Sequence, residues 1–125
     1  MKAILIAEDD VAVRALVTRA LTQDGHQVVA TVDGSEALEA FSREKGQFDL
    51  LLTDIKMPVM DGIALALAVA RDDPDLPILL MTGYADQRER AHGLDAIIRD
   101  VISKPFSVAT LRGAVNEALT VGTRS

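Results

Sequence analysis

The segment FDLLLTD at residues 48–54 decides the fold of this chain. It is a short apolar run that ends in an acid, which is typical of a strand buried on both faces. Strands of this kind belong to parallel sheets that helices cover on each side. The segment therefore predicts an α/β protein with a parallel sheet at its centre.

Outward from this segment, further apolar runs alternate with stretches of helical spacing. In the stretch at 10–24, apolar residues recur three and four positions apart, and Gly25 ends the pattern. The predicted strands are AILIA at 3–7, HQVVATV at 26–32, FDLLLTD at 48–54, PILLMTG at 77–83 and VISKP at 101–105. The predicted helices cover 10–24, the stretch after Ser35, 62–72, 86–94 and 107–119, and residues 94–103 could extend or break the fourth helix.

Strict alternation of strand and helix predicts an open, doubly wound, five-stranded parallel sheet of the flavodoxin-like type. We expect Asp10, Ser35 and Ser107 at helix N-termini, where their side chains can accept backbone N–H groups. One domain is expected over 1–121, followed by a short polar tail at 122–125.

Composition excludes several classes of protein. The absence of cysteine rules out disulfides, thiolate metal sites and cysteine nucleophiles. With 13 basic and 19 acidic residues, the net charge of −6 disfavours contact with nucleic acid. No apolar run is long enough for a signal peptide or a membrane span. These features suit a cytoplasmic protein that contacts neither nucleic acid nor membrane.

Polar residues stand at the carboxyl ends of four of the predicted strands. Because ligands of such sheets bind at the carboxyl ends of the strands, these residues are the candidate site. They are Glu8, Asp9 and Asp10 at the end of the first strand, Asp54 at the end of the third, Thr82 and Gly83 at the end of the fourth, and Lys104 at the end of the fifth. Each alone would be an ordinary cap or a solvated residue. Together, the clustered carboxylates favour a bound cation, and oxygen ligands without His or Cys favour Mg²⁺.

The same residues resemble the receiver domain of two-component response regulators. The resemblance rests on the acids at 8–10, the run DIKMPVMDG at 54–62, Thr82 and the triplet KPF at 104–106. It covers nearly the whole chain, in order and with fitting spacings. It implies that Asp54 accepts a phosphoryl group in a Mg²⁺-dependent reaction. A carboxylate is chemically suited to this step, since it can act as a covalent nucleophile.

The resemblance also implies a ligand set for the metal ion. Asp9 and Asp54 look like direct ligands, the backbone carbonyl of Lys56 like a third, and Glu8 like a ligand through water. This alignment of the acidic pair rests on the spacing to Arg14, and it leaves Asp10 one place outside the pair.

Two further residues are implied to bind the phosphoryl group. Thr82 looks like the hydroxyl that bonds a phosphoryl oxygen, and Lys104 like the cation that pairs with it. A cis peptide is expected between Lys104 and Pro105. Phosphoryl transfer depends chiefly on positioning and charge neutralisation, which these residues would supply.

The chain departs from the family pattern at several positions. Val101 stands where many receivers carry an aromatic switch residue, so Tyr84 is a candidate for that role, or else it only shields the site. Lys56 could slow loss of the phosphoryl group, or it could be an ordinary surface lysine. The stretch 94–103 lacks the usual turn before the fifth strand. His26 and His92 are expected on the surface, away from the site.

A response regulator of this type would take its phosphoryl group from a histidine kinase or a phosphotransfer protein and signal by protein contact, without being an enzyme. The stretches 49–66 and 82–90 resemble regulators of the CpdR type, which implies control of substrate delivery to the ClpXP protease in the unphosphorylated state. A phosphorelay sink, a docking module and an aspartate-nucleophile phosphatase are the alternatives. The phosphatase is disfavoured because Lys56 stands where its second acid would be, and a flavodoxin-like cofactor binder because acids would repel its phosphate.

Overall fold

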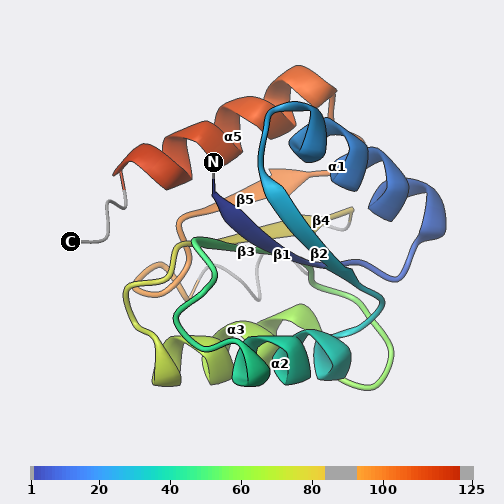
Figure 1. Ribbon diagram of the computed structural model, residues 1–125. Helices are drawn as coiled ribbons and strands as arrows, with labels where there is room; N and C mark the ends of the chain where they lie inside the picture. The colour runs from blue at the N-terminus through green and yellow to red at the C-terminus, as the bar shows by residue number, and fades with distance from the viewer. Residues whose placement is uncertain (1, 84–92, 122–125) are drawn as a thin grey trace.

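The computed structural model of the protein describes residues 2–83 and 93–121. Five parallel strands form one sheet in the order β2-β1-β3-β4-β5. The strands are β1 (Ala3–Ala7), β2 (Gln27–Thr31), β3 (Leu50–Asp54), β4 (Ile78–Thr82) and β5 (Asp100–Ser103), and the helices are α1 (Val11–Gln23), α2 (Gly34–Arg43), α3 (Gly62–Asp72) and α5 (Val108–Val121). Figure 1 shows α1 and α5 on one side of the sheet and α2 and α3 on the other. The predicted doubly wound α/β fold is confirmed.

The central strand β3 is buried along its whole length, as its sequence predicted. Side chains of a strand alternate between the two faces of the sheet. Leu51 accordingly packs in the cluster beneath α2 and α3, which also holds Phe41 and Leu65. Leu50 and Leu52 face the other way and pack in the cluster that contains residues of α1 and α5. The sheet therefore separates two apolar cores.

The order of the strands creates a switch point between β1 and β3. The chain leaves β1 for β2 on one side and then crosses to β3 on the other side of β1. In doubly wound sheets, the crevice outside the strand ends at such a point is the usual ligand site. In this register Ala7 lies beside Thr53, so the residues that follow β1 and those at the end of β3 meet at one edge.

The helix starts follow the predicted chemistry with one exception. The Asp10 carboxylate accepts the N–H groups of Ala12 and Val13, and the Ser107 hydroxyl accepts that of Thr110 at 3.0 Å. The prediction for Ser35 is wrong. Asp33 has the extended backbone of a cap, and its carboxylate accepts the Glu36 N–H at 2.8 Å, so Ser35 lies inside the first turn of α2.

The segment that precedes β5 forms turns and does not form a helix within the described residues. Residues 93–97 form turns, in which the Leu94 carbonyl accepts the N–H groups of Ile97 and Ile98 at 2.9 and 3.0 Å. The predicted fourth helix at 86–94 and the tail at 122–125 lie largely or wholly outside the described residues, as do Tyr84 and His92. None of the described helices is long and apolar enough to span a bilayer.

Candidate functional site

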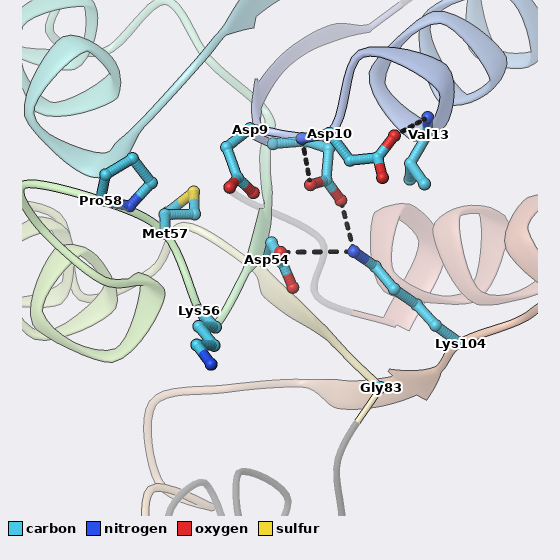
Figure 2. A pocket seen from close by; sticks show the side chains of 10 residues that line it. Asp9, Asp10, Val13, Asp54, Lys56, Met57, Pro58, Gly83 and Lys104 are labelled. Atoms are coloured by element: carbon cyan, nitrogen blue, oxygen red, sulfur yellow. Dashed lines mark hydrogen bonds and ion pairs between the residues drawn. The ribbon is translucent and has the colours of Figure 1, made fainter.

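A pocket of about 670 Å³ lies at the switch point, outside the carboxyl ends of the strands. Figure 2 shows its acidic centre, where side chains from three different elements converge. Glu8 and Asp9 come from the turn after β1, Asp54 is the last residue of β3, and Lys104 follows β5. The strand-end residues predicted from the sequence therefore line one pocket, with the exception of Thr82.

Three carboxylates stand close together in this pocket. Oxygens of Glu8, Asp9 and Asp54 all lie within 4.8 Å of one another. Glu8 is fully buried and Asp54 nearly so, whereas Asp9 is exposed. The group combines two carboxylates withdrawn from water with one that solvent reaches.

The Lys104 ammonium bridges the two buried acids. Its Nζ lies 2.6 Å from Oε1 of Glu8 and 3.3 Å from Oδ2 of Asp54. The lysine follows β5, and its backbone N–H donates to the Thr82 carbonyl at 2.7 Å, which fixes the start of its side chain beside β4. The Lys104–Pro105 peptide is cis, as expected. The short contact with Glu8 was not anticipated from the sequence, which suggested only a later role toward a phosphoryl group.

A backbone N–H group donates to the second carboxylate oxygen of each buried acid. The Asp10 N–H donates to Oε2 of Glu8 at 3.0 Å, and the Ile55 N–H donates to Oδ1 of Asp54 at 3.0 Å. Arg14 of α1 donates to the Glu8 carbonyl at 2.9 Å and so holds the turn after β1 in place. Each buried acid therefore has one oxygen toward the backbone and the other toward Lys104.

Burial dominates the protonation of this site. Desolvation raises the pKa of Glu8, and its hydrogen bonds from Lys104 and Asp10 offset only part of that effect. Desolvation likewise raises the pKa of Asp54 against the attraction of Lys104. Burial alone would lower the pKa of Lys104, but the hydrogen bond to Glu8 and the charge of Asp54 outweigh it and raise that pKa. The charged forms of Glu8 and Asp54 are therefore less favourable in this pocket than they would be in water.

The remaining predicted residues occupy different positions around the pocket. Asp10 is turned toward α1 by its cap bonds, away from the acidic group. Thr82 is buried at the end of β4, next to Gly83, which lines the pocket. Lys56 is exposed on the pocket wall, and Figure 2 shows its ammonium directed away from the carboxylates.

Two other residues that the sequence singled out lie elsewhere. Val101 is half-buried and packs against the core beneath α2 and α3. His26 precedes β2 at the amino end of the sheet, so it does lie away from the pocket. His26 is half-buried rather than fully on the surface. Its Nδ1 is enclosed and has no hydrogen-bond partner among the described residues.

The donor set fits a hard divalent cation. All three side chains offer carboxylate oxygens, and the described part of the cluster contains neither nitrogen nor sulfur ligands. Such oxygen sets suit Mg²⁺. Desolvation raises the pKa values of Glu8 and Asp54, and a cation bound beside these two buried acids would offset their negative charge.

The protein is thus a doubly wound α/β domain with a lysine-bridged acidic pocket at the switch point of its sheet, where domains of this class bind ligands. Comparison of the sequence with protein families makes the assignment specific. The sequence profile of the response regulator receiver domain matches residues 4–116. The chain belongs to this family.

Individual relatives agree with that assignment. Response regulator receiver protein CpdR of Brucella abortus is 43% identical over 117 residues, which cover 94% of this chain and 93% of the relative. Response regulator MprA of Mycobacterium leprae is 37% identical, and this chain spans only 50% of its length. The solved CheY-like receiver domain protein of Methanospirillum hungatei superposes with a TM-score of 0.89 at 30% identity, covering 98% of this chain and 96% of that one.

Proposed function

We propose that the chain is a phosphorylation switch of a two-component pathway, in which the Asp54 carboxylate accepts the phosphoryl group. The observation that carries this proposal is the position of Asp54 at the switch point, nearly buried, with one oxygen 3.3 Å from the Lys104 ammonium. A buried carboxylate beside a cation and an open pocket can approach phosphorus without competition from bulk water.

The acidic pocket supports a Mg²⁺-dependent reaction. Asp9, Asp54 and the backbone carbonyl of Lys56 would hold the ion directly, and Glu8 would do so through water. Bound there, Mg²⁺ supplies positive charge that offsets the charge on the phosphoryl oxygens. The exposed Asp9 is the ligand that an arriving ion can reach first.

The covalent step transfers the phosphoryl group from a phosphohistidine. An oxygen of Asp54 bonds to phosphorus while the bond from phosphorus to the histidine nitrogen breaks, and the imidazole keeps the electron pair and takes a proton from solvent. In hydrolysis, water bonds to phosphorus and the aspartyl oxygen leaves, which returns the carboxylate and releases inorganic phosphate. The chain thus promotes only its own phosphorylation and dephosphorylation, and we do not propose that it acts as an enzyme on a separate substrate.

Lys104 and Thr82 would bind the transferred group. The Lys104 ammonium already lies beside Asp54 and needs only to exchange a carboxylate for a phosphoryl oxygen. The Thr82 side chain is buried at the end of β4, the strand beside β3, and a movement of its hydroxyl toward the phosphoryl group would complete the binding.

The donor we propose is a histidine kinase or a phosphotransfer protein of the cytoplasm, and the output is a protein contact. The match to CpdR extends over nearly the full length of both sequences. Together with the resemblance of 49–66 and 82–90, it favours control of substrate delivery to ClpXP as the specific output. Binding of purified ClpX by the unphosphorylated protein, and its loss after phosphorylation, would support that output. Equal binding by both forms would contradict it.

The function can be tested with phosphoramidate, a small donor whose phosphorus–nitrogen bond mimics phosphohistidine. Wild type and Asp54→Asn are incubated with it in Mg²⁺ or in EDTA, and release of inorganic phosphate is followed. We expect release only from wild type in Mg²⁺. Release that is equal in Asp54→Asn, or no release at all, would argue against Asp54 as the acceptor.

A further inference from the structure

The loop between β3 and α3 carries the backbone carbonyl of Lys56, and its two ends are locked together. The Gly62 N–H donates to the Ile55 carbonyl at 2.8 Å. A Cβ at Gly62 would overlap the Asp54 carbonyl oxygen, so this close approach requires glycine. The path of the intervening residues is therefore confined, and the direction of the Lys56 carbonyl depends on how that path turns.

The turn itself is strained. Val59 has a φ of 70°, and the Met60 N–H donates back to the Pro58 carbonyl at 2.8 Å. This is the γ-turn with a positive central φ, which is rare and unfavourable, and more so for a β-branched residue. Val59 is also 84% exposed, so its own packing does not hold the turn.

The turn is held instead from outside the loop. The Gly34 N–H, at the first residue of α2, donates to the Met60 carbonyl at 3.1 Å. The first N–H groups of a helix have no partner within the helix, so this carbonyl completes the start of α2. A Cβ at Gly34 would overlap the Met60 carbonyl oxygen and carbon, so no larger residue permits the contact without displacing the loop.

We infer that Gly34 is a positioning residue for the metal site, acting through Met60 and the Val59 turn on the carbonyl of Lys56. The inference rests on the proposed function, because the Lys56 carbonyl is a ligand only if the pocket binds Mg²⁺. It links the start of α2 to a site that none of the α2 side chains lines among the described residues.

The affinity for Mg²⁺ tests the inference, measured by isothermal titration calorimetry on the whole chain. Gly34→Ala should bind Mg²⁺ roughly 10-fold more weakly, as is usual when a group that orients a ligand is lost. Gly113→Ala is the matched control, since a Cβ there meets nothing within 4 Å, and it should bind as wild type does. Wild-type affinity in a folded Gly34→Ala would overturn the inference.

If Gly34→Ala does not fold, amide hydrogen exchange on the wild-type protein tests whether the Gly34 N–H responds to Mg²⁺ binding. Addition of Mg²⁺ should slow exchange of the Gly34 N–H several-fold. The Glu36 N–H, which Asp33 binds in the same turn, should change little. Unchanged exchange at Gly34 with Mg²⁺ bound would overturn the inference. Absence of any Mg²⁺ binding by wild type would instead remove the proposed metal site, so the two failures are distinguishable.

Discussion

The Lys104 ammonium lies 2.6 Å from the Glu8 carboxylate and 3.3 Å from that of Asp54, although Glu8 and Lys104 are 96 residues apart in the chain. Its shorter contact is thus with the acid that is not the proposed acceptor. In the metal-free protein this single cation offsets part of the charge of two buried acids. Stability and metal binding should therefore both depend on the same three side chains.

Removal of the lysine should destabilise the protein in a pH-dependent way. Lys104→Met leaves the buried Glu8 without its ionic partner, which typically costs about 1–3 kcal/mol. Because burial raises the pKa of Glu8, the acid is protonated and neutral at low pH, where the loss is small. As the pH rises through that pKa, the unpaired carboxylate becomes charged and the loss grows.

Urea denaturation at acidic and neutral pH measures this effect. Lys45→Met is the matched control, since Lys45 forms only a 3.9 Å surface pair with Asp72. Exposed pairs contribute about 0–1 kcal/mol, so that variant should stay close to wild type. Equal losses of unfolding free energy for the two variants at neutral pH would contradict the account.

Neutralisation of the acceptor should stabilise the metal-free protein. The raised pKa of Asp54 means that the folded protein binds more protons than the unfolded chain between the ordinary and the raised value. Stability of wild type therefore falls as the pH rises through that window. Asp54→Asn lacks this loss, so its Tm in EDTA should exceed that of wild type at neutral pH, by about 4 °C for each kcal/mol in a domain of this size.

Mg²⁺ should reverse that difference. The ion stabilises whichever form binds it, so wild type should gain Tm on its addition and Asp54→Asn should gain much less. Asp75→Asn, on the surface, is the control for a general charge effect. A Tm of Asp54→Asn at or below that of wild type in EDTA would contradict the conclusion that the charged Asp54 carboxylate destabilises the metal-free protein.

Substitutions of the adjacent residues Asp9 and Asp10 should have different effects, one on metal binding and the other on helix capping. Asp10→Ala removes the cap of α1 and should cost about 1 kcal/mol of unfolding free energy with little effect on Mg²⁺ affinity. Asp9→Ala should do the reverse, with a change in stability within about 0.5 kcal/mol and at least a roughly 10-fold loss of affinity. Calorimetric titration and denaturation of both variants check this, and a larger affinity loss in Asp10→Ala would mean that the acidic pair is misassigned.

The Lys56 side chain should lengthen the life of the phosphorylated state. Lys56 is exposed on the pocket wall, where a flexible cation can pair with the phosphoryl group or obstruct attacking water. Lys56→Asn should lose the phosphoryl group faster, by up to about 10-fold, or about 1.4 kcal/mol of barrier height. The half-life of the adduct is compared with that of Lys45→Asn. An equal or longer half-life in Lys56→Asn would refute this role.

The strands, and the position of their carboxyl ends at one edge of the sheet, could be predicted because both follow from local patterns of apolar residues. The apolar run before Asp54 is typical of a buried strand, and parallel strands bring their carboxyl ends to one edge. Helix starts were less certain. Asp33 and Ser35 are both good caps, and the choice depended on which of them the backbone holds extended.

Contacts between distant segments could not be predicted in the same way. That Glu8 rather than Asp54 makes the shorter contact with Lys104 depends on side-chain reach across two strands of the sheet. The role of Gly34 depends on the approach of α2 to Met60, which no local pattern in the sequence indicated. Composition gave no sign of either contact.

The most direct test of the central claim is the intact mass of the protein after incubation with acetyl phosphate and Mg²⁺, beside Asp54→Ala. The account predicts a single phosphoryl adduct on wild type that requires Mg²⁺ and is absent from the variant. No adduct on wild type, or an adduct that persists in Asp54→Ala, would contradict it and would favour a docking module or another acceptor.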